Sequence, residues 1–404
     1  MDSLLFLVHR IPFPPNKGDK IRSFNLLKHL AKGFDVYLGT FIDDPADREN
    51  VEPLREFCSE IATFELNPTK RKIASVKGLL HGQPLTIPYY AKPQLHGWVR
   101  DVVKANEITD ALVFSSSMAQ YIDFPMYANM TRVIDFVDID SEKWKAYAER
   151  KSWPASSIYA REARTLFKYE MEIARRFDHC LFVSQAEAEL FERLTGIIDG
   201  KIGALHNGVD IDYFDPRCEF VDPYPRRVPV LVFTGAMDYW ANVDAVCWFA
   251  EEAFSAIRSA VPDAEFWIVG SQPSEAVKDL QNLEGVHVTG AVPDVRPFIQ
   301  YARAAVAPLR VARGIQNKVL EAMAMGKPVL TTPQAIEGIN VGPEYEPLIT
   351  EKIPEMVDIG RTLLKSDHYN SLGVVGRAYV EGQHDWTSQL KKIDTLFTKG
   401  TLKT

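Results

Sequence analysis

The sequence predicts an α/β protein with two doubly wound domains, each a parallel sheet with helices on both faces. Three observations predict this class. Short apolar runs alternate with longer amphipathic ones along most of the 404 residues. A proline-rich stretch at 216–229 interrupts the alternation, and a second strand–helix series begins after it. The length itself accommodates roughly two to three domains of about 150 residues.

The first series begins with a buried strand at 4–8, followed by an amphipathic helix at 21–31 for which Gly33 is a stop signal. Later strands follow the same alternation with helical patterns. They are expected at 35–41, 111–114, 132–136 and 180–183. In sheets of this kind, ligands bind outside the carboxyl ends of the strands, so candidate residues are sought there.

The second series has apolar runs separated by helices, one of which starts at about 242. The runs are VLVFTG, AEFWIVG, VHVTG, AAVAPL and PVLTT. We therefore expect a first domain at 1–205 and a second at 206–384, facing each other across a cleft. An amphipathic helix at 386–397 follows the second sheet. It either crosses back, which assigns 385–404 to the first domain, or packs on its own domain.

Composition excludes several classes of protein. The formal net charge of −8 disfavours a general nucleic-acid binder. Four cysteines without Cys-x-x-Cys spacing disfavour a disulfide scaffold or a zinc site and fit a reducing compartment. Phosphate-loop, G-x-G-x-x-G, G-x-S-x-G and H-E-x-x-H signatures are absent. No apolar run reaches the roughly 18 residues of a membrane span. We expect a cytoplasmic protein that meets a membrane only at its surface, at the inner face.

The strongest candidate site is RGIQNKVLEAMAMG, residues 313–326. A strand at 304–309 and a break at Arg313 and Gly314 precede a helix that starts near Gln316. Free backbone N–H groups at a helix N-terminus attract anions, and the positions concerned are Gly314, Ile315, Gln316 and Asn317. Lys318 adds a positive charge, and Glu321 on the same face can accept from two adjacent hydroxyls, as on a ribose. A nucleoside diphosphate fits this pattern; a capped helix with a Lys–Glu surface pair is the alternative.

A second candidate is FTGAMDYWANVD, residues 233–244. A strand ends at Gly235, where the missing side chain lets a ligand approach the backbone. A helix begins near Asn242, which is a candidate ligand contact. Turn and cap roles for Asp238 and Asn242 are the alternative.

The loop at 9–22, HRIPFPPNKGDKIR, is unusually rich in proline and charge. Gly18 is expected to adopt a backbone conformation that other residues resist. Lys17, Lys20 and Arg22 are expected to place positive charge at the edge of the first domain, on the acceptor side. A plain rigid loop is the alternative.

Asp138 and Asp140 form an Asp-x-Asp pair whose oxygens suit Mg²⁺ or Mn²⁺; Asp140 is also a natural helix start. Residues 143–176 then carry nine Lys/Arg against four Glu, with aromatics interleaved. This stretch is a candidate contact for anionic lipid headgroups, and a solvated helix face is the alternative. A smaller basic run comprises Lys70, Arg71, Lys72 and Lys77.

Four segments occur in the order found in family-4 glycosyltransferases with the GT-B fold, which the sequence resembles. They are HNGVDIDYFDP, VLVFTGAMDYWANVDAV, AEFWIVG with VHVTGAVPDV, and GIQNKVLEAMAMGKPVL. A narrower bacterial group, the sugar transferases of exosortase/PEP-CTERM and exopolysaccharide systems, is similar over nearly the whole chain. The segments concerned are PFPPNKGDKIRSFNLLKHL, SSSMAQY, DFVDIDSEKWKAYA and ARGIQNKVLEAMAMGKPV.

The resemblance implies transfer of a sugar from a nucleoside diphosphate sugar, of the UDP or GDP series, to a glycan or lipid-linked acceptor. It implies retention of configuration, no cofactor and no bound metal. Glu321 matches the carboxylate that holds the donor ribose, and Lys318 a diphosphate-binding base. Gly18 matches a glycine loop near the donor phosphate and acceptor. Gly290 to Val292 match the loop beside the nucleobase.

Two departures from the family pattern concern charge. Many relatives have a further Glu at the position of Arg313, and an Arg and a Lys in the loop that is here Asp238 to Asn242. We expect Arg313 and Lys318 to meet the phosphate charge, and the donor sugar stays open. Alternatives are a metal-dependent GT-A transferase using Asp138 and Asp140, a non-catalytic GT-B scaffold in a polysaccharide assembly complex, and an epimerase or phosphorylase.

Overall fold

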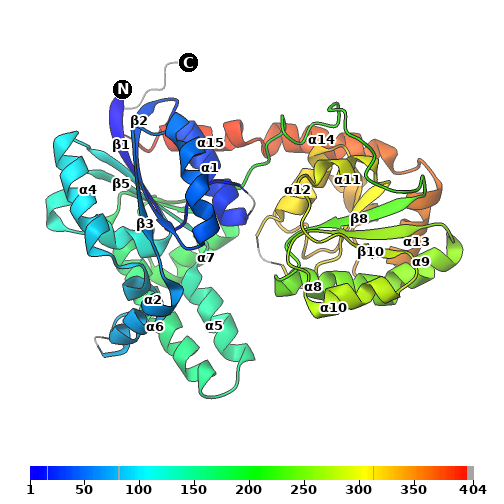
Figure 1. The fold of residues 1–404 in the computed structure, drawn as a ribbon, viewed down its shortest axis with the longest axis horizontal. Coiled ribbons are helices and arrows are strands. Elements are labelled where there is room, and N and C mark those ends of the chain that lie inside the picture. The colour runs from blue at the N-terminus through cyan, green and yellow to red at the C-terminus, as the bar shows by residue number, and fades with distance from the viewer. Residues whose placement is uncertain (16, 81, 313, 398–404) are drawn as a thin grey trace. The chain divides into compact units, whose positions relative to one another are not determined.

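The computed structural model describes residues 1–15, 17–80, 82–312 and 314–397. It divides into two compact units (Figure 1). Unit 1 contains Met1–His206 and the chain from Leu390 onward, and unit 2 contains Asn207–Gln389. The expected divisions at 205/206 and 384/385 therefore lie within a few residues of the observed ones.

Unit 1 is built on a seven-stranded sheet in the order β3-β2-β1-β4-β5-β6-β7, in which every pairing is parallel. Its strands are β1 Asp2–Val8, β2 Phe34–Ile42, β3 Glu60–Glu65, β4 Asp110–Phe114, β5 Thr131–Val137, β6 His179–Phe182 and β7 Ile202–Ala204. The direction of strand order reverses between β1 and β4. Ligands in doubly wound sheets bind at such a switch point, so the loop after β1 is where a ligand of unit 1 is expected.

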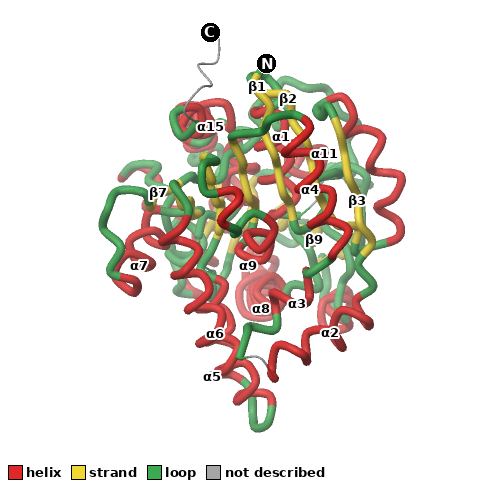
Figure 2. Tube along the Cα trace, turned by 90° about the vertical axis from the view of Figure 1, so that its left-hand side faces the viewer, coloured by secondary structure: helices red, strands yellow, loops and turns green. Residues whose placement is uncertain are grey.

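Helices connect these parallel strands (Figures 1 and 2). They are α1 Gly18–Leu30, α2 Pro68–Leu80, α3 Thr86–Tyr90, α4 Pro93–Ala105, α5 Asp140–Arg150, α6 Ala155–Arg176 and α7 Gln185–Thr195, with 3₁₀ turns η1 Pro45–Glu56, η2 Ser116–Tyr121 and η3 Pro125–Tyr127. Residues 4–8 of β1 are an unbroken, buried apolar run because helices cover both faces of a parallel sheet. In Figure 2, α5 and α6 extend beyond the strands as a helical hairpin.

Unit 2 is built on a five-stranded parallel sheet in the order β10-β9-β8-β11-β12. Its strands are β8 Val230–Thr234, β9 Glu265–Val269, β10 Val286–Val288, β11 Ala304–Ala307 and β12 Val329–Thr331. Here the switch point lies between β8 and β11. The two strongest candidate segments of this unit follow these two strands, so the topology brings both to the position where ligands are expected.

The helices of unit 2 are α8 Trp240–Trp248, α9 Ser255–Ala260, α10 Glu275–Asp279, α11 Arg296–Tyr301, α12 Asn317–Ala324, α13 Ile353–Lys365 and α14 Asn370–Gln383, with η4 Phe249–Phe254, η5 Leu280–Asn282 and η6 Pro343–Leu348. Segment η4 is a π-helical turn that continues α8 into α9. The proline-rich stretch 216–229 has no helix or strand, as expected. It is packed nonetheless: Tyr224 is buried and its hydroxyl donates to the Phe298 carbonyl at 2.6 Å.

The last helix, α15 Trp386–Asp394, returns the chain to unit 1. Its Asp394 Oδ1 lies 2.6 Å from His29 Nε2 of α1. The Phe397 ring packs edge-on against Phe34, with centroids 5.6 Å apart. Of the two arrangements expected for this helix, the structure has the one that crosses back.

Candidate active site

The N-terminus of α12 follows β11 at the switch point of unit 2. Gly314 adopts a positive φ of 64°, which glycine accepts without strain. Gln316 is the residue before the helix, and its Nε2 donates to the Gly314 carbonyl at 3.0 Å. Ile315 is buried, and Asn317 begins the helix. The helix start expected here is therefore present; Arg313 lies outside the described residues.

Lys318 in the first turn of α12 contacts the loop and helix that follow β8. Its Nζ donates to Asn242 Oδ1 at 2.7 Å, and Asn242 Nδ2 donates to the Ala236 carbonyl at 2.8 Å. The ammonium also lies 5.0 Å from the Phe233 ring centroid. An ammonium has three N–H donors, and Asn242 engages one of them. Asn242 therefore lies at the sheet edge where a ligand is expected, and it also holds Lys318 in position.

Gly235 makes room for this pair. A Cβ at Gly235 would lie 2.8 Å from Asn242 Nδ2 and 3.4 Å from Lys318 Cε. The next strand end comes even closer, because a Cβ on Gly270 would lie 1.7 Å from the Gly235 carbonyl oxygen. Gly235 was expected to let a ligand approach the backbone. In the structure, its missing side chain makes room for the side chains of Asn242 and Lys318 and lies close to the backbone at Gly270.

The environment of Lys318 and Glu321 favours their neutral forms. Burial lowers the pKa of Lys318 to about 8, although the Glu321 charge acts in the opposite direction. Burial likewise raises the pKa of Glu321 to about 7, against the effect of Lys318. A bound anion would offset the lost solvation of the ammonium. This combination of burial with a specific charge partner is frequent at functional sites.

A second cluster lies near Glu321 and was not anticipated from the sequence. The Arg296 guanidinium lies 3.6 Å from the Tyr213 ring centroid and forms a bidentate pair with Asp294 at 3.0 and 2.7 Å. Burial, the charge of Asp294 and, less strongly, that of Glu321 raise the pKa of Tyr213, while Arg296 opposes them. Tyr213 belongs to the junction segment HNGVDIDYFDP, for which the sequence suggested no side-chain role.

The loop after β10 leads into this second cluster. Gly290 has a φ of 72°, and nothing lies within 4 Å of a Cβ built on it. Val292 is partly buried and packs against the core of unit 2. The loop therefore leaves open space beside a left-handed glycine, at the same sheet edge as Lys318.

In unit 1, two of the basic residues expected at the acceptor edge lie inside the protein. Arg22 is 0% exposed: it pairs with Asp135 at 2.7 and 3.0 Å and donates to the Leu205 carbonyl at 2.7 Å. Lys20 is buried and pairs with Asp47 at 2.8 Å. The expectation that Arg22 presents charge at the surface was wrong, because it neutralises a core carboxylate on β5.

Gly18 and Lys17 keep their expected place after β1. Lys17 is exposed and directly precedes α1, and Gly18 is its first residue. Gly18 lacks the positive φ expected of it, so the backbone argument was wrong. A Cβ there would meet nothing within 4 Å. The space beside the Gly18 Cα is therefore open within unit 1.

Asp138 and Asp140 both pair with Lys143, at 2.8 and 3.2 Å. Burial lowers the pKa of this ammonium, but the charges of Asp140 and Asp138 outweigh that effect and raise it above its ordinary value. The pair thus holds a protein cation where the metal-dependent alternative requires a divalent ion. Within the described ranges, no cluster of three or more His, Cys, Asp or Glu side chains is suited to a metal. Asp140 is also the first residue of α5, as the helix-start alternative expects.

Part of the chain matches a known family, and the fold matches solved structures. Residues 228–364 match the sequence model of a family described as "Glycosyl transferases group 1". The fold is GT-B: two parallel-sheet α/β domains that match GT-B glycosyltransferase structures along the full chain. This excludes the GT-A alternative. The matched domain and the fold together support a glycosyltransferase enzyme. No curated protein matches the chain.

Three solved structures illustrate the likeness. Sucrose-phosphate synthase from Thermosynechococcus elongatus is 17% identical, covers 98% of both chains and superposes with a TM-score of 0.68. HepE from Anabaena, in complex with UDP and glucose, is 16% identical, covers 97% of this chain and 98% of its own, and has a TM-score of 0.63. WaaG, a glycosyltransferase involved in lipopolysaccharide biosynthesis, is 16% identical. The match covers 98% of this chain and 100% of WaaG, with a TM-score of 0.63.

Across the described part of the chain, every helix is too short or too polar to cross a bilayer.

Proposed function

We propose that this protein transfers a sugar from a nucleoside diphosphate sugar to a glycan or lipid-linked acceptor. One observation carries the proposal: Lys318 lies in the first turn of α12, 2.7 Å from Asn242, at the switch point between β8 and β11. A helix N-terminus and a lysine together supply N–H donors and positive charge for a diphosphate. Glu321 lies one turn further along α12, three residues from Lys318 and therefore on the same helix face, where it is proposed to hold the ribose.

The proposed chemistry is stabilisation of the departing diphosphate without a metal and with retention of configuration. As the bond from sugar to phosphate breaks, negative charge grows on the phosphate oxygens. Lys318, the N–H groups at residues 314–317 and Arg313 are proposed to receive that charge. A well-placed donor of this kind contributes about 3 kcal/mol, roughly a hundredfold in rate.

The nucleoside is proposed to lie along the other side of the same sheet edge. Glu321 accepts from the ribose hydroxyls, and the loop Gly290 to Val292 lies beside the base. HepE, which shares the fold, forms a complex with UDP and glucose, which supports a donor of the UDP series ahead of the GDP series.

The acceptor is assigned to unit 1 in this proposal. Lys17 and Gly18 lie after β1 at the switch point, and Asp138 and Asp140 follow β5 at the same sheet edge. The cellular role proposed is bacterial exopolysaccharide biosynthesis of the exosortase/PEP-CTERM-associated type, in the cytoplasm and at the inner face of the membrane.

Ligand-observed NMR on the purified protein tests the donor site, with UDP, GDP, ADP and their common sugar conjugates. We expect selective binding of one base and its loss in Lys318→Ala. Lys327→Ala is the matched control, because the pKa of Lys327 is also lowered to about 8 by burial and its Nζ donates to the Ala302 carbonyl instead.

Two outcomes would count against the proposal. Binding that survives Lys318→Ala unchanged removes the diphosphate assignment. Binding of the conjugate without release of nucleoside diphosphate, whatever acceptor is supplied, favours the non-catalytic scaffold.

A further inference from the structure

A pocket of about 590 Å³ lies in unit 1, lined by residues of α2, α3, α4 and α6 and of the turn η2. We call it the α3 pocket, because Ile87 and Pro88 of α3 belong to its lining. Its volume is within the range of roughly 300–1,000 Å³ that is usual for sites of small ligands. Its lining residues are distinct from those of the candidate active site.

The polar side chains of the α3 pocket offer both hydrogen-bond donors and acceptors. They are Arg71, Gln83, His96, Gln120 and Asp123. The guanidinium and the amide groups donate, and the amide and carboxylate oxygens accept. Burial lowers the pKa of His96, so its neutral ring, which has one donor and one acceptor, dominates at pH 7. With one arginine and one aspartate, the lining has no net formal charge.

Protein contacts hold three of these side chains by one end and leave the other end available. Arg71 Nη1 donates to a backbone carbonyl at 2.6 Å, and Gln120 Nε2 donates to another at 2.7 Å. Asp123 Oδ2 accepts from Arg176 Nη1 at 2.5 Å. Within the described ranges, no protein group bonds Asp123 Oδ1, Gln120 Oε1 or the ring nitrogens of His96, and none of these atoms is fully buried. The pocket therefore keeps acceptors that a ligand can reach.

Apolar surface completes the lining of the α3 pocket. Phe124 is 45% exposed, and its ring lies edge-on to that of His96 with centroids 5.7 Å apart. Ile87 and Pro88 add aliphatic surface. The electron-rich face of an aromatic ring attracts the polarised C–H groups of a ligand. A ligand with polar groups at its rim and C–H groups on its faces thus fits the composition of the lining.

This mixture of donors and acceptors distinguishes between classes of ligand. A phosphate or a carboxylate only accepts, so it would leave the Asp123 and Gln120 oxygens unpaired and would face the Asp123 charge. A wholly apolar ligand would remove these groups from water without replacing their hydrogen bonds, which is unfavourable for each of them. A hydroxyl both donates and accepts, so a ring with several hydroxyls can satisfy both kinds of group.

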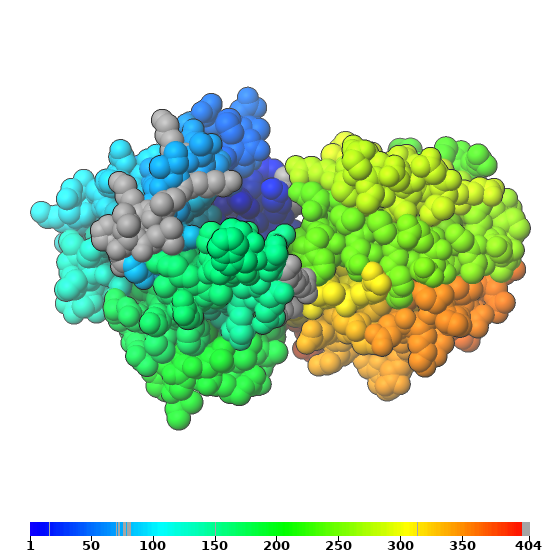
Figure 3. Space-filling model, turned by 90° about the horizontal axis from the view of Figure 1, so that it is seen from below, coloured from blue at the N-terminus to red at the C-terminus, as the bar shows by residue number. Residues whose placement is uncertain are grey.

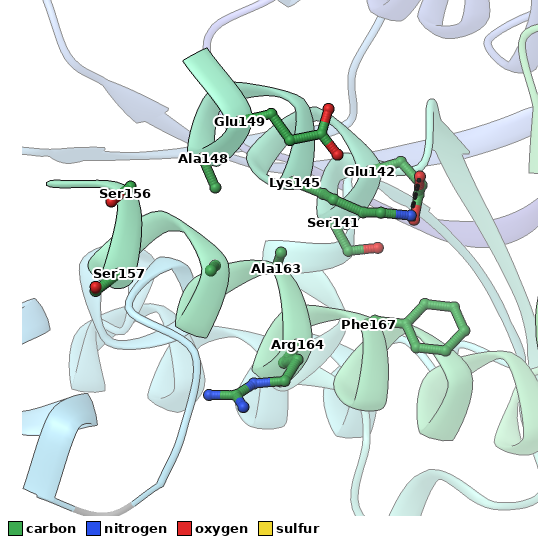
Figure 4. A pocket seen from close by; sticks show the side chains of 11 residues that line it. Ser141, Glu142, Lys145, Ala148, Glu149, Ser156, Ser157, Ala163, Arg164 and Phe167 are labelled. Carbon is green, nitrogen blue, oxygen red and sulfur yellow. Dashed lines mark hydrogen bonds and ion pairs between the residues drawn. The ribbon is translucent and has the colours of Figure 1, made fainter. Parts of the chain in front are cut away.

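The same argument assigns no ligand to the groove of about 500 Å³ between α5 and α6 (Figure 4). These two helices, teal to green, belong to the exposed surface in Figure 3. The groove has two carboxylates, Glu142 and Glu149, beside two cations, Lys145 and Arg164. Lys145 already pairs with Glu142 at 3.2 Å, as the dashed line in Figure 4 marks.

Helix α3 also connects the α3 pocket with the loop after β1. Ile87 and Pro88 line the pocket, and Tyr90 at the end of the same helix contacts His9, with ring centroids 5.9 Å apart. His9 directly follows β1. The turn η2, which carries Gln120, follows β4, the other strand at the switch point. The pocket is thus one short helix away from the sheet edge to which the acceptor is assigned.

We propose that the α3 pocket binds a sugar unit of a glycan, with hydroxyls bonded to Asp123 and Gln120 and a C–H face against Phe124. In the reaction proposed above, this glycan is the acceptor, and the bound unit is a different one from the unit that receives the new sugar. The inference rests on the proposed function only in naming the glycan the acceptor, since the binding itself needs no donor.

Saturation-transfer NMR on the full chain, without any nucleotide, tests the pocket. The probes are cellotetraose, laminaritetraose, maltotetraose and mannotetraose, with uridine as a non-glycan ligand that also carries donors and acceptors. We expect at least one tetrasaccharide to bind with a Kd of about 1 mM or tighter, and uridine not to compete with it. The affinity is expected to be equal at about 50 and 500 mM NaCl, because the ligand has no charge to be screened.

Two variants assign the binding to the α3 pocket. Phe124→Ala is expected to weaken the tetrasaccharide about fivefold or more through loss of the aromatic face. Met126→Ala is its matched control, because Met126 is 66% exposed two residues further on and does not line the pocket. His96→Phe keeps an aromatic ring but removes both nitrogens, and is expected to weaken binding about three- to tenfold. His368→Phe makes the same change at an exposed position of unit 2. Thermal unfolding checks that all four variants fold.

Three results would overturn the inference: no binding of any tetrasaccharide, binding that survives both Phe124→Ala and His96→Phe, or full competition by uridine, which would make the pocket a nucleoside site. A chain that binds a nucleoside diphosphate but no tetrasaccharide loses this inference alone. Tetrasaccharide binding in a chain that binds no nucleotide keeps the sugar site and removes only its role as the acceptor site.

Discussion

The Nζ of Lys318 donates a hydrogen bond of 2.7 Å to Oδ1 of Asn242, which lies 76 positions earlier in the chain. The contact joins the first turn of α12 to α8, the two helices that follow the switch-point strands. Because Asn242 is held in turn by the Ala236 carbonyl at 2.8 Å, the lysine has a fixed position before any ligand arrives. Preorganised donors of this kind need little rearrangement when charge develops.

Donor affinity is expected to fall as the pH rises through about 8. Lys318 is charged below its pKa, which burial lowers to about 8, and only the charged form attracts a diphosphate. Asn242→Asp is expected to move this decline to higher pH, because a neighbouring carboxylate favours the ammonium. Titration of affinity against pH checks both, and Lys318→Arg, which does not deprotonate, is expected to show no decline near pH 8; Glu321, whose pKa burial raises to about 7, titrates below that point. An unshifted decline in Asn242→Asp would show that another group titrates.

Breaking the Arg22–Asp135 pair is expected to destabilise unit 1. Arg22→Ala leaves a buried carboxylate without its partner, which costs about 3–5 kcal/mol. Urea unfolding measures the loss, with hydrogen exchange of β1 and β5 assigning the transition to unit 1. Arg22→Leu combined with Asp135→Leu is expected to recover most of it, since no unpaired charge remains. Arg217→Ala, at an exposed pair with Asp215, is expected to leave the midpoint unchanged.

Gly270, which follows β9, and Gly18, the first residue of α1, are expected to respond oppositely to alanine. Gly270→Ala places a Cβ 1.7 Å from the Gly235 carbonyl and is expected to disrupt folding of unit 2. Gly18→Ala meets open space and is expected to fold normally while lowering kcat/KM, if a substrate approaches α1 there. Gly97→Ala, also in open space but within α4, is the control for folding and activity. Full activity of Gly18→Ala would remove Gly18 from the site.

Removing the chain after Gln389 is expected to destabilise unit 1 and spare unit 2. The deletion takes away Leu390, Ile393 and Phe397, which are buried, and burial of such side chains contributes about 1.5–3 kcal/mol each. Hydrogen exchange is expected to rise in α1 and β2, which lose His29 and Phe34 contacts. Equal protection of these elements with and without the segment would contradict the expectation.

Most of the fold followed from periodicity. Strands β1, β4 and β5 are mostly apolar and buried in a parallel sheet, so their bounds were predicted to within a few residues. Strand β3 was missed because EIATFE lies at the sheet edge and is only partly buried, with charges at both ends. Composition predicts one basic segment at 143–176 and does not reveal that it forms two helices, α5 and α6, with a turn at 151–154.

Only part of the candidate site was predicted from the sequence. Lys318, Glu321 and the helix start were found because charge and helix signals are local in sequence. The burial of Arg22 was not, because its partner Asp135 lies 113 residues away and no local pattern connects them. The Tyr213–Arg296 stacking was missed for the same reason, although Tyr213 lies in a segment that the resemblance had singled out and Arg296 directly follows another.

Unit 2 begins at Asn207 and ends at Gln389, and its two ends meet: the Val209 amide donates to the His384 carbonyl at 2.7 Å, and Val209 pairs with Asp385 as an isolated bridge. A Cβ on Gly208 would lie 2.8 Å from Trp386, so the two chain segments are in close contact. In sequence, unit 2 is therefore inserted into unit 1, and the two segments that begin and end it lie side by side. If the donor binds to unit 2 as proposed, exchange of residues 207–389 between related chains is expected to transfer the donor specificity without altering unit 1.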